Sequence, residues 1–536
     1  MTETIDVHKI FAEYFKGSET LAYALSSKLA DGNICLDIAE YKTKLPTLLD
    51  EQRAKESFKE KDMVFWTPES FETQCAEGVF VTHSFEELKP FVIQNGKAYL
   101  HRYFQYETQI IENIKRLGGN FDIITGGPGT GKTYSVSTKL VELFGKNTDL
   151  KVALAAPTGK AAARMNESIK KFAENPKNSI DDAVKNRLVS LKPQTLHRLL
   201  GYQRDSVFFR HDAENPLPFD VVIIDECSMI DGAMMAKVLH GLGDKTRLFL
   251  LGDKDQLASV EAGSVFGDIC RAGNSPVLKN KVEIKEKSWR FDSEKGIGKF
   301  SRQLISGSFA GIIEYSGDEQ LEIDTEYNDD LFMKFALLYK PFILESDIKQ
   351  ALIKLNLVRF LCATKQNCHS VSETNKRIEK ILTQSIGNKD LFYPKEGFYH
   401  NQPVIVTQNN YELGIFNGDV GIIRKITVKG IESFYAHFEN IEGDIVKIPA
   451  AYLTNYETVF AMTIHKSQGS EFEQVVVILP ENENNKLLTR ELLYTAVTRA
   501  KSKVLLQTSE AVLLRCSTQD VMRASGLENR LKSMKL

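Results

Sequence analysis

The sequence of 536 residues has few cysteines, no long apolar run and little excess charge. A membrane-spanning helix needs about 18 or more consecutive apolar residues, and the chain contains no such run. Its first residues also lack the basic and then apolar profile of a secretion signal. The seven cysteines are scattered and include no C-x-x-C pair, so neither a disulfide framework nor a zinc or iron–sulfur site is indicated. We therefore expect a cytoplasmic protein that makes no membrane contact.

The charge is unevenly distributed, although its sum is only −3. Residues 1–100 carry 11 Lys and Arg against 17 Asp and Glu, and the remaining residues carry 57 against 54. The acidic first segment fits a solvated surface, and it fits equally a module that docks onto another protein and stays off DNA. With 42% hydrophobic and 26% charged residues, the chain has the composition of a folded protein, and its length allows about three or four domains.

The most informative segment lies between an apolar run (121–125) and a helix-like stretch (134–144), and it matches the pattern G-x-x-x-x-G-K-[ST]. Its members are Gly126, Gly127, Pro128, Gly129, Thr130, Gly131, Lys132 and Thr133. The glycines let backbone N–H groups turn around phosphate oxygens, and the helix N-terminus adds positive charge. Lys132 is expected to reach the β- and γ-phosphates, and Thr133 to hold Mg²⁺. The segment predicts a P-loop that binds ATP with Mg²⁺.

Further motifs downstream predict hydrolysis of the bound nucleotide. The apolar run 221–224 ends in Asp225 and Glu226, which suit a Mg²⁺ ligand and a base that polarises the attacking water. Gln256 follows another apolar run (248–251) and is placed to hydrogen-bond the γ-phosphate, although a plain turn also explains the preceding Gly-Asp. Arg290 and Arg499 are candidates for stabilising charge on the γ-phosphoryl oxygens, and each is equally explained as a surface arginine or an ion-pair partner.

Together, these motifs resemble the ordered series of superfamily 1 helicases. The matching segments are the P-loop, 155–162, 225–231, 252–257, 289–290, 463–471 and 494–499. The resemblance covers about residues 100–510. Segments 195–201, 225–231 and 413–421 resemble more specifically the RecD family, the alpha subunits of bacterial exodeoxyribonuclease V. That family usually has Ala where this chain has Cys227, a small apolar change for which we expect no functional consequence.

The resemblance implies a role for each motif residue. Lys132, Thr133, Asp225, Glu226 and Gln256 would line one side of an ATP cleft. Arg290 and Arg499 would reach in from the other side and sense closure, and Glu471 would contact the ribose. The residues that match strand-contacting motifs are Thr158, Lys160, Thr195, His197, Thr463 and His465. A helix cap or a turn explains any one of them equally well. Gln105 and Gln109 are both available to read adenine, and Gln109 is favoured because it resembles the start of a helix beside the base.

The pattern predicts an α/β protein with two RecA-like P-loop NTPase domains, an inserted SH3-like β-barrel and a mainly helical N-terminal domain. The expected bounds are 1–108 for the N-terminal domain, 109–280 for the first RecA-like domain, 281–413 with 457–536 for the second, and 414–456 for the barrel. Strands are expected at 152–156, 221–224 and 248–251 in the first domain, and at 358–363, 404–407, 475–479 and 504–506 in the second.

The resemblance implies an ATP-dependent 5′→3′ DNA helicase that works on single-stranded DNA from broken ends, in repair and recombination. It implies RecB-like and RecC-like partners in a heterotrimer at the bacterial nucleoid, with any nuclease chemistry in a partner. One alternative is a stand-alone helicase of the same branch. Another is a nucleotide-dependent switch that does not translocate, against which Glu226 and the two arginines argue.

Replacing Lys132 with Gln is expected to abolish ATP hydrolysis and leave the fold intact, because the neutral amide cannot offset charge on the β- and γ-phosphates. Phosphate release with and without single-stranded DNA measures the first effect, and circular dichroism checks the second. DNA-stimulated hydrolysis that survives in this variant would contradict the assignment of a motor.

Overall fold

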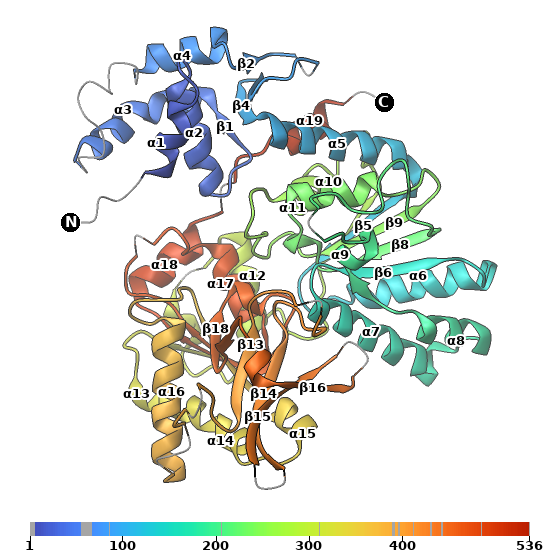
Figure 1. The fold of residues 1–536 in the computed structure, drawn as a ribbon, viewed down its shortest axis with the longest axis vertical. Coiled ribbons are helices and arrows are strands. Elements are labelled where there is room, and N and C mark those ends of the chain that lie inside the picture. The colour runs from blue at the N-terminus through green and yellow to red at the C-terminus, as the bar shows by residue number, and fades with distance from the viewer. Residues whose placement is uncertain are drawn as a thin grey trace.

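The computed structural model shows an N-terminal domain, two α/β lobes and a small β domain inserted into the second lobe (Figure 1). This arrangement confirms the predicted fold class. The residues described are 6–54, 67–84, 86–204, 206–309, 311–388, 392–394, 397–410, 412–428, 431–440, 443–483, 485–521 and 523–534. Among them, no helix is both long and apolar enough to cross a membrane.

The first lobe is built on a six-stranded parallel sheet with the order β10-β5-β9-β8-β6-β7. The strands are β5 (Phe121–Gly126), β6 (Val152–Ala156), β7 (Gln194–Thr195), β8 (Val221–Ile224), β9 (Arg247–Gly252) and β10 (Val282–Lys285). Every residue of β8 is buried, because helices cover both faces of the sheet. The structure therefore has the three strands expected here. Strand β10 lies beyond the expected boundary at 280, so the first lobe extends past it.

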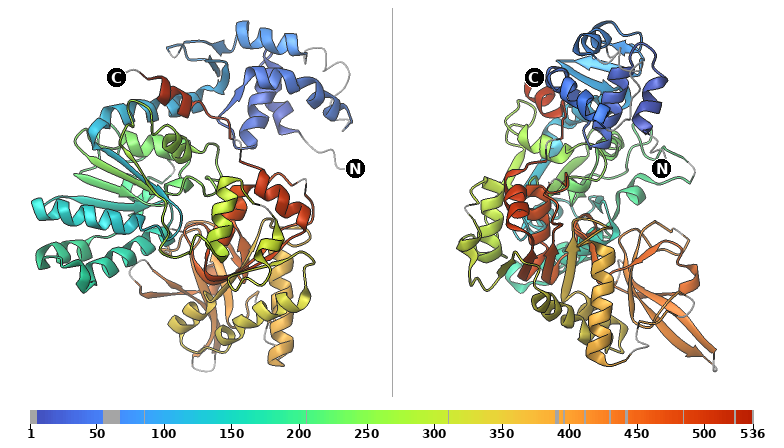
Figure 2. Two further views of the ribbon diagram at one scale, coloured as in Figure 1. Left: turned by 180° about the vertical axis from the view of Figure 1, so that it is seen from behind. Right: turned by 90° about the vertical axis from the view of Figure 1, so that its left-hand side faces the viewer.

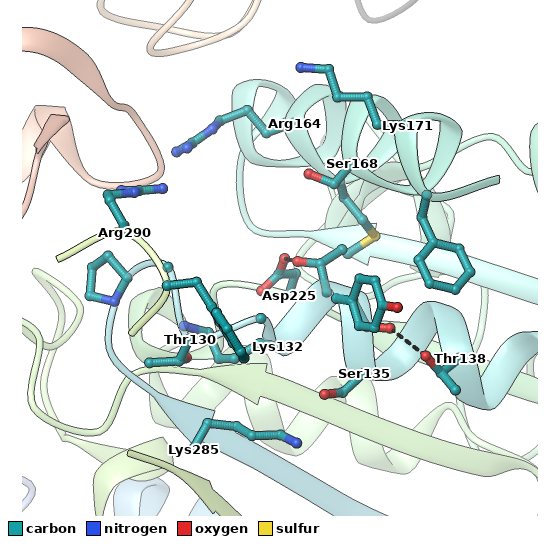
Figure 3. A pocket seen from close by; sticks show the side chains of 18 of the residues that line it. Thr130, Lys132, Ser135, Thr138, Arg164, Ser168, Lys171, Asp225, Lys285 and Arg290 are labelled. Atoms are coloured by element: carbon teal, nitrogen blue, oxygen red, sulfur yellow. Dashed lines mark hydrogen bonds between the residues drawn. The ribbon is translucent and has the colours of Figure 1, made fainter. Parts of the chain in front are cut away.

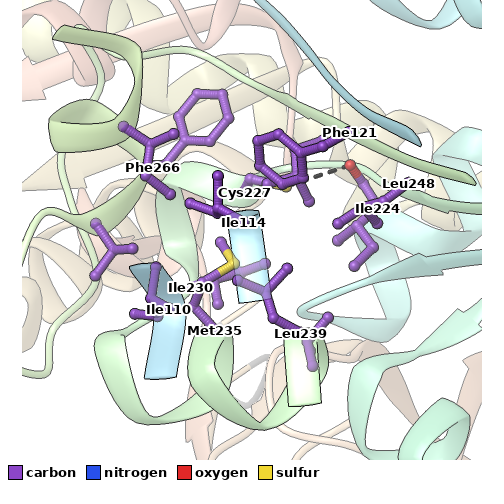
Figure 4. Close-up of a cluster of buried hydrophobic side chains, with 14 of the residues drawn as sticks. Ile110, Ile114, Phe121, Ile224, Cys227, Ile230, Met235, Leu239, Leu248 and Phe266 are labelled. Atoms are coloured by element: carbon purple, nitrogen blue, oxygen red, sulfur yellow. Dashed lines mark hydrogen bonds between the residues drawn. The ribbon is translucent and has the colours of Figure 1, made fainter. Parts of the chain in front are cut away.

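Two sets of helices cover the faces of this sheet. On one face lie α6 (Lys132–Lys146), α7 (Gly159–Glu174) and α8 (Asp182–Ser190). On the other lie α5 (His101–Leu117), α9 (Leu196–Leu200), α10 (Gly232–His240) and α11 (Val265–Arg271). Figure 4 shows the core on this second face, where Ile110 and Ile114 of α5 lie near Met235 and Leu239 of α10. Cys227 is buried in the same core.

The second lobe has a five-stranded parallel sheet with the order β11-β20-β19-β12-β18. The strands are β11 (Leu321–Asp324), β12 (Val358–Cys362), β18 (Ala461–Thr463), β19 (Phe472–Ile478) and β20 (Ala500–Gln507). The surrounding helices are α12 (Gly296–Ser306), α13 (Asp329–Ala336), α14 (Lys340–Ile343), α15 (Ile348–Leu355), α16 (Val371–Ile386), α17 (Arg490–Val497) and α18 (Glu510–Thr518).

The inserted β domain starts earlier than its expected bounds of 414–456. The segment 404–407, which we expected in the second parallel sheet, instead lies in strand β13, which pairs antiparallel with β14 and β17. A short apolar run fits a buried parallel strand and a packed antiparallel strand equally, so periodicity did not separate them. The strands are β13 (Gln402–Val406), β14 (Val420–Val428), β15 (Ile431–Glu439), β16 (Ile445–Pro449) and β17 (Tyr456–Thr458). The sheet projects from the second lobe (Figure 2, right).

The N-terminal domain combines helices with a four-stranded sheet of order β1-β4-β3-β2. Its elements are α1 (Val7–Glu13), α2 (Glu19–Ala30), β1 (Cys35–Asp37), α3 (Ile38–Ala54), α4 (Pro68–Glu77), β2 (Val81–Thr82), β3 (Phe91–Gln94) and β4 (Lys97–Leu100). Helices α1 and α2 are separated at Gly17, which adopts a φ of +85° between them. Leu21, Phe71 and Phe91 are among the side chains that form a core within this domain.

The last part of the chain leaves the second lobe, to which we had assigned residues 457–536, and returns to the first. Helix α19 (Leu527–Ser533) packs against α5 and α11 (Figure 1). Its Leu527 and Leu531 belong to the first-lobe core. Just before α19, the buried Glu107 carboxylate of α5 accepts hydrogen bonds of 2.9 Å from Ser525 Oγ and from the Gly526 N–H. The chain between α18 and α19 therefore tethers the second lobe to the first.

Leu527→Ala is expected to lower the free energy of unfolding by about 2–5 kcal/mol, the usual cost of truncating a fully buried leucine. The side chain is 0% exposed, so the variant leaves a cavity in the first-lobe core. Thermal unfolding followed by circular dichroism measures the shift. Leu514→Ala on α18 is the matched control, because that side chain is 57% exposed and its loss changes stability by about 0.5 kcal/mol or less. Equal shifts in both variants would contradict the placement of α19.

Candidate active site

The P-loop connects β5 to α6 and depends on glycine at two positions. Gly129 and Gly131 have φ values of +75° and +80°, in the left-handed region that side chains disfavour. A Cβ on Gly129 would also lie 2.5 Å from the Cβ of Arg290. The loop passes so close to Arg290 that only glycine fits at position 129. Lys132 Nζ donates hydrogen bonds to the carbonyl oxygens of Gly126, at 2.6 Å, and Gly127, at 3.1 Å. The lysine therefore lies over the loop, within reach of phosphates bound by it.

A cavity of about 1200 Å³ opens beside the P-loop and has walls from both lobes (Figure 3). Most of the residues predicted for the nucleotide site line it. They are Pro128, Gly129, Thr130, Gly131, Lys132, Thr133, Asp225, Glu226, Gln256, Arg290, Glu471 and Arg499. The parallel sheet explains this convergence, since the loops after β5, β8 and β9 leave from one edge.

Thr133 and Asp225, the two residues predicted to hold Mg²⁺, lie side by side in the cavity wall. Thr133 Oγ1 donates to Asp225 Oδ2 at 3.5 Å, and burial together with the neighbouring Glu226 raises the pKa of Asp225 to about 6. A bound cation offsets that cost of keeping the carboxylate charged. Mg²⁺ commonly takes only one or two protein oxygens and fills its other positions with water and phosphate, so this pair fits it.

Glu226 adopts a backbone conformation that is unfavourable for its residue type. Its φ is +55°, and its N–H donates to Asp225 Oδ1 at 2.8 Å. A left-handed residue other than glycine costs about 1 kcal/mol or more, and such residues cluster at active sites. The turn directs the chain sharply away from β8 and places Glu226 on the cavity wall.

Gln256 is linked to the second lobe through Asp253, a motif residue for which the resemblance implied no role. Asp253 is 1% exposed, and its Oδ2 accepts a bond of 3.0 Å from Gln256 Nε2 and one of 2.9 Å from the Tyr494 hydroxyl. Asp253 follows β9 in the first lobe, whereas Tyr494 belongs to α17 in the second. The Leu257 N–H likewise donates to Thr495 Oγ1 at 2.8 Å. The segment that carries Gln256 is thus held by buried polar contacts with the other lobe.

Of the two predicted arginines, only Arg499 comes from the side of the cavity that the resemblance implied. Arg290 lies on the first-lobe side, because it follows β10 and the preceding Trp289 N–H donates to the Gly129 carbonyl at 2.8 Å. The expectation that it reaches in from the other lobe is therefore wrong. Arg499 does come from the second lobe, where it is almost fully buried and donates through Nε to the Thr495 carbonyl at 3.1 Å.

Glu471 is held between two arginines, of which Arg164 was not predicted. Its carboxylate oxygens lie 2.6 Å from Arg290 Nη2 and 2.5 Å from Arg164 Nη2. Burial alone would raise the pKa of Glu471, but Arg164 and Arg290 lower it to about 2. Arg164 lies on α7 and lines the cavity. No local motif in the sequence marked it, since its role depends on a contact with a residue far along the chain. The ribose contact predicted for Glu471 stays a prediction.

The structure does not bring Gln109 to the cavity. Among the described residues that line the cavity, neither Gln105 nor Gln109 is present. Both lie on α5, which packs with α10 on the face of the sheet opposite α6. Gln109 was favoured as the start of a helix beside the base, but it lies within α5, which begins at His101. A helical pattern in the sequence does not determine which face of the sheet the helix covers.

The residues predicted to contact a DNA strand fall at the ends of strands in both lobes. Thr158 Oγ1 accepts from the Ala161 N–H at 3.2 Å and caps α7, and Thr195 caps α9. Ala156 of β6 pairs with Thr195, so these two loops leave adjacent strands. The second-lobe set comes close as well, because a Cβ on Gly469 would lie 3.7 Å from Thr158 Oγ1.

The other members of this set are partly or largely buried. Lys160 Nζ lies 5.4 Å from the centroid of the Phe472 ring in the second lobe, and burial lowers the pKa of Lys160 to about 7. His197 packs edge-on against Phe209 with ring centroids 5.7 Å apart. Thr463 Oγ1 accepts from the Lys466 N–H at 3.3 Å. Burial also lowers the pKa values of His197 and His465, so both imidazoles favour the neutral form.

Comparison with known families gives three matches along the chain. The AAA domain family matches residues 111–262, the UvrD-like helicase C-terminal domain matches 458–507, and the SH3 domain of ATP-dependent RecD-like DNA helicases matches 374–438. Two lobes, a P-loop cavity between them and a helicase C-terminal domain define an ATP-dependent DNA helicase, which binds nucleotide at the P-loop.

Similar proteins identify the branch. The RecBCD enzyme subunit RecD of Mycolicibacterium smegmatis is 37% identical over 430 residues, which cover 78% of this chain and 73% of that protein. The Haemophilus influenzae RecBCD enzyme subunit RecD is 31% identical, and the alignment covers 98% of this chain and 95% of that protein. The chain belongs to the RecD family. Among solved structures, the Pif1 helicase from Candida albicans aligns with 77% of this chain and 95% of its own, with a TM-score of 0.40 and 18% identity.

Tyr494→Phe is expected to lower kcat for ATP hydrolysis by about tenfold or more, because a hydrogen bond to a charged group contributes roughly 1.5–3 kcal/mol. The variant removes the hydroxyl that joins α17 to the buried Asp253. Steady-state ATPase with saturating DNA measures the effect. Tyr452→Phe is the matched control, since that side chain is 61% exposed and does not line the cavity. An unchanged kcat for Tyr494→Phe would show that this inter-lobe bond does not support catalysis.

Proposed function

We propose that this chain is the 5′→3′ motor subunit of a RecBCD-type helicase–nuclease that acts on broken DNA ends in double-strand break repair and recombination. The observation that carries the motor assignment is the cavity built from both lobes, in which the γ-phosphate side is linked to the second lobe through Asp253 and Tyr494. A cavity of this kind changes shape when its nucleotide is cleaved, and that change moves one lobe against the other.

The residues of the cavity divide the work of hydrolysis. Lys132 offsets negative charge on the β- and γ-phosphates, and Glu226 orients and polarises the attacking water. Arg499 and Arg290 stabilise charge on the γ-phosphoryl oxygens from opposite walls of the cavity. Thr133 and Asp225 would hold Mg²⁺, which neutralises phosphate charge when bound. Gln256 connects the γ-phosphate position to Asp253 and thus to the second lobe.

The strand-contacting face follows from the same geometry. Thr158, Lys160, Thr195 and His197 lie on the first lobe, and Thr463 and His465 lie on the second. Hydroxyl and ammonium groups suit contacts with phosphate, which hold a strand without reading its sequence. As the cavity opens and closes, the first-lobe set and the second-lobe set bind the DNA strand tightly in turn. The inserted β domain helps to hold the DNA strand.

The names of the relatives support RecB-like and RecC-like partners, with which this chain would form a heterotrimer at the nucleoid in the cytoplasm. The acidic N-terminal domain is the part that would dock onto them. The alternative of a stand-alone helicase has some support from the ATP-dependent RecD2 DNA helicase of Deinococcus radiodurans, whose name does not describe a RecBCD subunit. That protein is 29% identical to this chain, and the alignment covers 72% of this chain but only 46% of that protein. Gel filtration alone and beside candidate partners separates the two readings.

Strand displacement by the purified chain, with ATP and Mg²⁺, tests motor and direction together. We expect unwinding of a duplex that carries a 5′ single-stranded tail and none of the matched duplex with a 3′ tail. The Lys132→Gln variant is the control for contaminating helicase. Unwinding from the 3′ tail alone would support helicase activity but refute the proposed 5′→3′ direction. The proposal of RecB-like and RecC-like partners would then also lose its support.

A further inference from the structure

The first two turns of helix α7 contain residues predicted to contact a DNA strand and a residue that lines the ATP cavity. It begins at the Thr158 cap, and Lys160 follows in its first turn. Arg164 lies four residues after Lys160, a spacing that places two side chains on the same helix face. Arg164 lines the ATP cavity, where its guanidinium and that of Arg290 lie at the same end (Figure 3).

Arg164 makes two contacts, both with one segment of the second lobe. Its Nη2 lies 2.5 Å from Glu471 Oε2, and its Nη1 donates to the Gly469 carbonyl at 3.0 Å. The same segment begins with Thr463 and His465, which belong to the strand-contacting set of that lobe. One arginine therefore joins the two strand-contacting segments, one from each lobe, at the edge of the ATP cavity.

The charges at this point are not balanced. Arg164 and Arg290 share the single carboxylate of Glu471, so the cluster carries excess positive charge beside the P-loop. Within the described part of the chain, Arg290 Nη1 is buried and has no hydrogen-bond partner. An anionic phosphate chain in the cavity competes with Glu471 for these guanidinium groups. Nucleotide therefore changes the contact that fixes the 463–471 segment against α7.

We propose that Arg164 is a positioning residue that couples the nucleotide in the cavity to the grip on single-stranded DNA. It holds Gly469 and Glu471 so that Thr463 and His465 face the first-lobe contacts, and the phosphate chain alters this hold through the shared carboxylate. The inference rests on the proposed motor function and adds to it a residue and a route between the two sites. The resulting coupling is reciprocal, so DNA must change nucleotide affinity by the same factor.

The test measures that factor in Arg164→Ala. Fluorescence anisotropy gives the Kd for an oligothymidine with and without a non-hydrolysable ATP analogue, and the ratio of the two values is the coupling factor. We expect the factor to fall about tenfold in the variant, within the range of typical allosteric couplings. Affinity for the analogue without DNA should fall by a smaller factor than the coupling does, because Arg164 is one cavity residue and Lys132 with the P-loop carries most of that binding.

Two further variants separate coupling from folding. Glu167→Ala removes an ion pair with Lys171 one turn further along α7, and it should leave the factor unchanged. Arg164→Lys keeps the charge but cannot hold both Gly469 and Glu471, so it should restore the factor only in part.

The opposing outcomes are distinct. A coupling factor in Arg164→Ala equal to that of the unmodified protein overturns the proposal and leaves the motor intact. A loss of DNA and analogue binding in equal proportion, with a lower melting temperature, also overturns it, because it shows a purely structural role. Absence of any coupling in the unmodified protein refutes the proposed motor itself.

Discussion

Parallel strand pairing in the first lobe is the constraint on which the active site depends. Strands β5, β8 and β9 run in the same direction, so the P-loop, the Asp225–Glu226 turn and the Gln256 loop all leave from one edge of the sheet. Backbone hydrogen bonds between the strands fix the spacing of these three loops, so their side chains are held close together by the sheet. The apolar residues of β8 and the helices on both faces make that edge rigid.

The second lobe completes the site through polar groups that contact the first lobe. Tyr494 reaches the Asp253 carboxylate, Thr495 accepts from Leu257, and Glu471 meets Arg164 and Arg290. Polar contacts of this kind depend strongly on geometry, so small displacements break them. An apolar interface tolerates sliding over several orientations. The polar contacts therefore define the arrangement of the two lobes around the cavity more narrowly than apolar packing alone does.

The sequence predicted those parts of the candidate site whose residues are neighbours in the chain. The P-loop, the acidic pair after β8 and the buried strands could be predicted because each is a short segment with its own chemistry. The roles of Asp253, Tyr494 and Arg164 could not, since each acts through a partner more than 200 residues away. Strand β10 gave little signal because it lies at the sheet edge and is only partly buried, and β13 has an apolar run that fits either type of sheet.

The tether of the chain end to the first lobe bears on how the protein is made. Leu527 and Leu531 complete a core whose other members come mainly from residues 110–278. The ribosome must therefore release nearly the whole chain before the first lobe can finish packing. Until then its apolar face beside α5 and α11 stays uncovered, a condition in which multidomain proteins are prone to aggregate. Cotranslational folding can establish the sheet of this lobe, but its core closes only after residues 527–531 have been synthesised.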